Sequence, residues 1–114
     1  MNHTVILVTR EGMGSAAGLP ALQIKLVEKY FSLMLAGDDL PNAICFYTDG
    51  VKLTTENSPV LEQLKTLEQK GVRLVICSTC LEAMQLTDKV RVGIVGGMPD
   101  ILEAQLKAEK VISI

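Results

Sequence analysis

The feature that most constrains this chain is the alternation of apolar, β-branched runs with stretches of helical spacing. Strands are predicted at residues 4–9, 42–48, 72–76, 90–94 and 111–114, and helices at residues 19–36, 60–70, 79–85 and 98–108. The strands are apolar on both faces, which is typical of a parallel sheet covered by helices. A chain of 114 residues suits one domain, so residues 1–114 are predicted to form a single α/β domain.

Charge and composition argue against nucleic-acid and membrane partners. Eleven Lys and Arg residues stand against thirteen Asp and Glu residues, without a basic run. The chain has no Trp, two Phe and two Tyr, so few rings are available to stack on unpaired bases. Residues 1–8 lack the cationic segment and the long apolar stretch of a signal peptide or a membrane span. We therefore expect a cytoplasmic location.

The candidate site is predicted where the strands end, because ligands of open parallel sheets collect at the carboxyl ends of the strands. Four segments are expected at that edge: residues 10–18, 48–54, 77–80 and 95–98. The third of these contains two of the three cysteines. Without an export signal, such a pair favours reduced, reactive thiols over a structural disulfide.

Cys77 is predicted at the carboxyl end of the third strand, just before a short helix. Thr79 and Glu82 have the spacing of a capping box, which places Cys80 at the first helical position. Helix-end N–H groups favour the thiolate, the form that attacks disulfides and persulfides. Cys45 lies inside a predicted strand and is interpreted as a core residue.

Neither a metal nor a cofactor is predicted. A zinc site would need four ligands, but Cys45 lies in a strand and His3 begins a strand at the opposite edge. The segment from Gly12 through Gly14 to Gly18 has the wrong spacing for a dinucleotide-binding loop, and no acidic residue follows the second strand at the expected place. Its backbone N–H groups are instead candidates for holding a small anion.

Three segments of the chain resemble the DsrE-like domain of YedF-type proteins, which are labelled sulfurtransferase-like and linked to selenium metabolism. The matching residues are Leu40-Pro41, Gly50-Val51-Lys52-Leu53-Thr54-Thr55 and Cys77-Ser78-Thr79-Cys80-Leu81, continued by Val92-Gly93 and Met98. The likeness runs over essentially the whole chain. The likeness is interrupted at Ser78, where that family usually has glycine, and at Gly97, where it usually has asparagine.

The resemblance implies a three-layer α/β/α sandwich around a five-stranded parallel sheet, assembled as a homo-oligomer such as a trimer or hexamer. It also implies persulfide chemistry at Cys77, with Cys80 as the extra cysteine of the YedF type. YedF-type chains commonly carry a TusA-like domain that this sequence does not contain. A separate TusA-like sulfur carrier is therefore the expected partner.

The leading hypothesis is a sulfur carrier or sulfurtransferase-like protein that holds sulfane sulfur on Cys77 and resolves or relays it through Cys80. Whether the chain turns over a substrate as an enzyme stays open. Ligand contacts at the same edge are assigned to these residues: Arg10, Gly12, Gly14, Lys52, Ser78, Thr79, Gly97 and Met98. Two alternatives stay open, namely a non-catalytic oligomeric module that binds a small ligand or a partner, and a thiol–disulfide switch.

The predicted helix at residues 19–36 is apolar around most of its circumference. A helix that packs on one side against a sheet does not need so much apolar surface. We therefore expect this helix to lie in the interface between subunits. The expected contact residues are Tyr30, Phe31, Met34 and Leu35.

Overall fold

The computed structural model describes residues 2–114. Five strands form one sheet in the order β4-β3-β2-β1-β5, and every neighbouring pair is parallel. The strands are β1 (Thr4–Val8), β2 (Ala43–Phe46), β3 (Arg73–Cys77), β4 (Ile94–Gly96) and β5 (Lys110–Ser113). The predicted five-stranded parallel sheet is confirmed.

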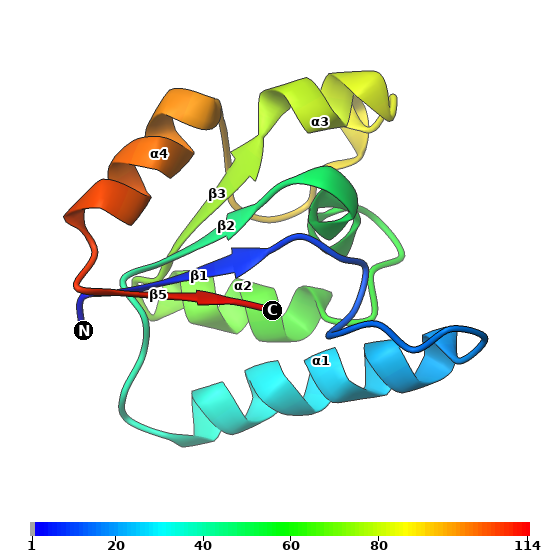
Figure 1. The fold of residues 1–114 in the computed structure, drawn as a ribbon, viewed down its shortest axis with the longest axis horizontal. Helices are drawn as coiled ribbons and strands as arrows, with labels where there is room; N and C mark the ends of the chain where they lie inside the picture. The colour runs from blue at the N-terminus through cyan, green and yellow to red at the C-terminus, as the bar shows by residue number, and fades with distance from the viewer. Residues whose placement is uncertain (1) are drawn as a thin grey trace.

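Helices lie on both sides of this sheet (Figure 1). Two of them, α1 (Pro20–Ala36) and α2 (Leu61–Gln69), run side by side across one face. On the opposite side, α4 (Met98–Lys107) covers the sheet and α3 (Ser78–Ala83) continues from the end of β3. Two 3-10 helices, η1 (Thr48–Thr54) and η2 (Thr87–Lys89), complete the chain. The three-layer α/β/α arrangement is the predicted one.

The core lies mainly between the sheet and the pair α1 and α2. Ile44 and Phe46 of β2 are fully buried, as are Phe31 of α1 and Leu64 of α2. Removing such side chains from water stabilises the fold by about 1.5–3 kcal/mol each. The central strands β1 and β2 are buried along their whole length, as expected for parallel strands with helices on both sides.

The fourth strand begins four residues later than predicted. Val90, which the apolar pattern placed in the strand, instead pairs with Thr55 as an isolated antiparallel bridge. Gly93 has a φ of +81°, a left-handed conformation that interrupts an extended strand. Only Ile94–Gly96 therefore pairs with β3. The prediction of a strand at residues 90–94 is wrong.

The surface of α1 differs from the predicted one. Phe31 is fully buried in the core, so it cannot contact another subunit. The large apolar side chains that α1 exposes are Leu22, Leu26 and Leu33. At 100° per residue these three leucines fall within about 40° of one another around the helix, so they form one apolar stripe. We call Leu22, Leu26 and Leu33 the α1 stripe.

Within residues 2–114, no helix combines the length and the apolar character that crossing a membrane requires.

Candidate functional site

Cys77 is the last residue of β3 and the residue immediately before α3. Its backbone is in register with Gly96 of β4, so two neighbouring strands end together at this point. The Cys77 side chain is only 1% exposed. The structure therefore places Cys77 at the predicted edge of the sheet, but beneath the surface.

The start of α3 corrects the predicted capping box. The helix begins at Ser78, with Cys77 as its N-cap and no side-chain capping hydrogen bond. Because β3 runs directly into α3, Thr79 lies inside the first turn and cannot serve as the cap. Cys80 is consequently the third residue of the helix rather than the first.

The sulfur of Cys80 interacts with two neighbours. It accepts a hydrogen bond from the backbone N–H of Thr48, with an N···S distance of 3.1 Å. It also lies close enough to the thiol of Cys77 for that thiol to influence its pKa. Cys80 is half-buried, so it is the more accessible thiol of the pair.

The pKa of Cys80 is raised, whereas the sequence predicted a lowered one. Burial is the largest cause, and the neighbouring Cys77 thiol raises the pKa further. The N–H of Thr48 acts in the opposite direction, because it stabilises the thiolate. Desolvation therefore outweighs the stabilising N–H of Thr48. Cys80 is therefore a largely protonated thiol at neutral pH.

Thr48 holds three strand ends together. It has a φ of +49°, which is rare for a β-branched residue. Its hydroxyl lies 2.9 Å from the carbonyl oxygen of Thr9 and 2.7 Å from that of Tyr47, and donates to them. Thr48 thus links the segments after β1 and β2 to α3. The sequence did not single out this residue, because a left-handed threonine goes against its intrinsic preference.

Gly50 lets η1 approach the end of β1. A Cβ atom at Gly50 would lie 1.9 Å from the carbonyl oxygen of Val8, so no other residue fits without a backbone shift. Gly50 is buried, and its N–H donates to the carbonyl oxygen of Tyr47. Gly50 therefore has a packing role at the end of β1.

The glycine-rich loop lies against α1. The N–H of Met13 donates to the carbonyl oxygen of Gln23 at 2.9 Å, and the Gln23 side-chain amide donates to the carbonyl oxygen of Gly14 at 2.8 Å. A Cβ atom at Gly12 would lie 2.7 Å from the Gln23 backbone. Gly12 and Gly14 are therefore tied to the start of α1, while Arg10, nearer to β1, is exposed.

Lys52 lies in η1 and forms an ion pair with Asp49 at 3.3 Å. It lines a cavity of about 430 Å³ together with Glu11 and Met84. Met84 follows Cys80 by one helical turn, and its N–H donates to the Cys80 carbonyl oxygen. The structure thus brings Lys52 to the end of α3 rather than to the cysteine sulfurs.

Gly97 and Met98 follow the end of β4. Gly97 is the N-cap of α4, and its N–H donates to Asp100 Oδ2 at 2.9 Å. Because Cys77 is in register with Gly96, Gly97 and Met98 come directly after the residue beside Cys77. Met98 is 49% exposed, so it lies at the surface of this edge.

All three cysteines are free thiols. Cys45 is fully buried in β2, as predicted for a core residue. Burial raises its pKa to about 11, despite an opposing effect of the charge of Arg73. Across residues 2–114, no group of three or more His, Cys, Asp or Glu side chains is arranged to hold a metal ion.

The chain can now be compared with known proteins. The profile of the DsrE/DsrF-like family matches residues 3–114. Among solved structures, the chain is similar to a protein of unknown function, MTH1491, from Methanobacterium thermoautotrophicum, with a TM-score of 0.65, 20% identity and 97% of each chain covered. It is also similar to the ychN protein from E. coli, with a TM-score of 0.68, 18% identity and 100% of each chain covered. No curated protein sequence matches the chain.

At these identities the structural likeness shows the fold alone. The family match covers nearly all of the sequence, including both strand-end cysteines. The chain belongs to the DsrE/DsrF-like family.

Proposed function

We propose that this protein carries sulfane sulfur as a persulfide on Cys77 and exchanges it with a partner through Cys80. Membership of the DsrE/DsrF-like family, which is generally implicated in sulfur relay, supports the proposal. The observation that carries it is the pair itself: two neighbouring free thiols, of which one is buried and one is accessible.

The two thiols suit two successive exchange steps. The Cys80 thiolate attacks the outer sulfur of a donor persulfide, the donor leaves as a thiolate, and Cys80 becomes the persulfide. The Cys77 thiolate then attacks that outer sulfur, and the Cys80 thiolate leaves. Neither step needs an oxidant or a reductant, because each exchanges one S–S bond for another.

Burial decides which thiol has which role. Cys77 lies at the carboxyl edge of the sheet, but its side chain is only 1% exposed. A large donor therefore reaches Cys80 first. A persulfide on Cys77 would be shielded from thiols in solution, which favours storage there and relay through Cys80.

The partners of this site belong to the same proposal. The donor or acceptor is proposed to be a separate TusA-like protein, as the likeness to YedF-type domains and their link to selenium metabolism suggests. Arg10, Lys52 and Met98 would contact the incoming partner, because all three lie at or near the carboxyl edge of the sheet. The remaining proposed contacts are Gly12, Gly14, Ser78, Thr79 and Gly97.

A homo-oligomer is also proposed, with a revised interface. The α1 stripe exposes leucines at 41%, 41% and 73%, and such apolar stripes on helices commonly pack against another chain. The predicted contact through Phe31 is replaced by this stripe. Tyr30, Met34 and Leu35 pack partly against the core and can contribute only their exposed edges.

The test is intact-mass spectrometry after brief treatment with polysulfide. The unmodified protein should gain the mass of one sulfur atom, and alkylation with peptide mapping should find that sulfur on Cys77. Cys80→Ser should slow the uptake, and Cys77→Ser should leave a short-lived adduct on Cys80. Cys45→Ser is the matched control and should behave like the unmodified protein. No adduct on the unmodified protein would overturn the proposal.

A thiol–disulfide switch is the second candidate, favoured by the closeness of these two free thiols. Two treatments separate the candidates: mild oxidation with diamide and incubation with polysulfide. If the protein is a switch, diamide should convert Cys77 and Cys80 completely and reversibly into a disulfide, with loss of two hydrogens. Polysulfide should then add no sulfur. If the protein is a sulfur carrier, polysulfide should add one sulfur atom.

A further inference from the structure

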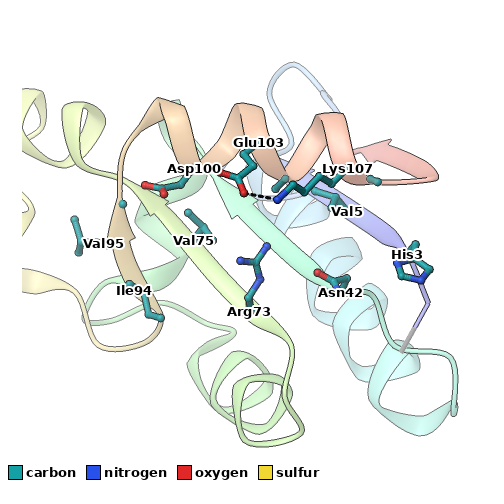
Figure 2. Close-up of a pocket in the computed structure, with 13 residues that line it drawn as sticks. His3, Val5, Asn42, Arg73, Val75, Ile94, Val95, Asp100, Glu103 and Lys107 are labelled. Atoms are coloured by element: carbon teal, nitrogen blue, oxygen red, sulfur yellow. Dashed lines mark hydrogen bonds and ion pairs between the residues drawn. The ribbon is translucent and has the colours of Figure 1, made fainter.

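A second cavity lies between α4 and the sheet, with Cys77 and Cys80 outside its wall (Figure 2). Its volume is about 710 Å³, within the range of small-molecule sites. Val5, Val75 and Ile94 contribute from the strands, and Ala104 and Ala108 contribute from α4 and the residue after it. The cavity therefore has an apolar middle section, as ligand sites usually do.

The polar wall residues are divided between the two ends of this cavity. His3, Asn42 and Arg73 stand at the amino ends of β1, β2 and β3, and Lys107 ends the antiparallel helix α4. Asp100, near the start of α4, lies at the other end, beside Gly96. The topology thus gives the cavity a basic end and an acidic end.

Most charges in the cavity wall already have partners. Glu103 forms an ion pair with Lys107 at 2.7 Å, and this contact, aided by the charge of Arg73, lowers the pKa of Glu103. Asp100 accepts the N–H of Gly97, where a negative charge also suits the helix end.

Arg73 is the exception. The Arg73 side chain is exposed to solvent, and within residues 2–114 its guanidinium forms neither a hydrogen bond nor an ion pair. The backbone N–H of Arg73 donates to the carbonyl oxygen of Asn42. Figure 2 shows this side chain reaching from β3 into the space beneath α4, with Asn42 nearby. Its five donors are arranged to bind a carboxylate through two parallel hydrogen bonds.

We propose that this cavity binds a small organic monocarboxylate with an apolar body. The carboxylate pairs with Arg73 at the basic end, and the side-chain amide of Asn42 can donate to it. The apolar body extends along Val75 and Ile94 beneath Ala104. This site is separate from the Cys77–Cys80 pair and does not depend on its sulfur chemistry.

The charge balance selects the ligand class. One unpaired guanidinium matches one negative charge. A second negative charge on the ligand would face Glu103 and Asp100 across the cavity, which disfavours dicarboxylates and phosphate esters. A cationic head group would be repelled by Arg73 at the basic end of the cavity. A neutral apolar molecule would leave the guanidinium unpaired, so it should bind more weakly.

The experiment is an NMR titration of the ¹⁵N-labelled full chain with sodium hexanoate. Saturable shifts are expected at the amides of Val75, Ile94 and Ala104. Arg73→Gln should weaken binding about tenfold or more, because it removes a charge-assisted bidentate contact. Arg91→Gln is the control and should bind as the unmodified protein does, because Arg91 lies outside the cavity wall and pairs with Glu56. Hexanol should bind as weakly to the unmodified protein as hexanoate does to Arg73→Gln.

Three results would overturn the proposal. One is the absence of saturable shifts, which would also be the result if a second copy of the chain covered the cavity. Another is equal affinity in Arg73→Gln, whose fold the same spectra check. The third is a set of shifts centred on Cys77 and Cys80, which would place hexanoate at the other site.

Discussion

The backbone N–H of Thr48, just after β2, donates a hydrogen bond to the sulfur of Cys80 in α3, over 3.1 Å. This contact ties the accessible thiol to a residue that the Thr9 carbonyl holds in turn. The reactivity of Cys80 therefore depends on how η1 is anchored, as well as on its own helix.

Replacing Thr48 tests that dependence. Thr48→Val removes the hydroxyl that bonds the carbonyl oxygens of Thr9 and Tyr47, and should lower the free energy of unfolding by about 1 kcal/mol. It should also raise the pKa of Cys80, because the N–H is no longer held on the sulfur. Urea denaturation measures the first effect, and the pH dependence of alkylation measures the second.

Thr48→Ser is the matched control, since it keeps the hydroxyl and should change both quantities little. Equal pKa values for Cys80 in Thr48→Val and Thr48→Ser would show that the hydroxyl does not position the N–H.

The three cysteines should differ in their rates of alkylation. A brief pulse of iodoacetamide should label Cys80 before Cys77 and Cys45, since those two are buried. The pKa of Cys80 lies above its ordinary value, so its thiolate fraction is small at pH 7 and grows with pH. Its labelling rate should therefore still be rising above about pH 9.

Peptide mapping at a series of pH values makes this measurement. A rate for Cys80 that already reaches its plateau near neutral pH would mean that the N–H of Thr48 outweighs burial. Labelling first at Cys45, whose pKa is about 11, would contradict its place in the core.

Gly50→Ala should damage the fold around the site. The new Cβ would lie 1.9 Å from the Val8 carbonyl oxygen. Because the Cβ is fixed rigidly to its own backbone and the oxygen belongs to the backbone of β1, one of the two segments must move. We expect a loss of roughly 3 kcal/mol or more in the free energy of unfolding. Gly37→Ala is the control: Gly37 has a φ of −92°, and its new Cβ would make only ordinary contacts. Its effect should stay within about 0.5 kcal/mol. Similar melting curves for the two variants would contradict the close approach.

Sedimentation of single-charge variants tests the proposed oligomer. Leu26→Glu, in the middle of the α1 stripe, should reduce the sedimenting mass toward that of one chain. Leu102→Glu, on the exposed side of α4, is the comparison and should leave the assembly intact. If only Leu102→Glu dissociates the assembly, the interface lies on α4, and a single chain already present without substitution would remove the idea of an oligomer.

The fold was largely predictable from the sequence because apolar runs and helical spacing are local signals. Those signals placed Cys77 at the end of the third strand, where the structure has it. They misplaced the fourth strand, because the pairing of Val90 with Thr55 and the left-handed Gly93 depend on contacts between distant segments.

The site was less predictable, because burial and backbone conformation decide its chemistry. A capping motif at Thr79 and Glu82 could not reveal that β3 enters α3 without an intervening residue, so the position of Cys80 shifted by two. Desolvation of Cys80 and the left-handed Thr48 arise only when three strand ends meet. The sequence could place both cysteines at one edge, but it could not assign an exposed fraction to either.

Arg73 and Cys77 are the first and last residues of β3, and four residues apart they face the same side of the sheet. At about 3.3 Å per residue their Cα atoms lie roughly 13 Å apart. Neighbouring strands are hydrogen-bonded along both sides of this segment near its end, so the spacing cannot change without breaking the sheet. One protein chain could therefore hold a compact acid at Arg73 and a sulfur atom on Cys77 at the same time without contact between them. The binding of either one could be assayed while the other is present.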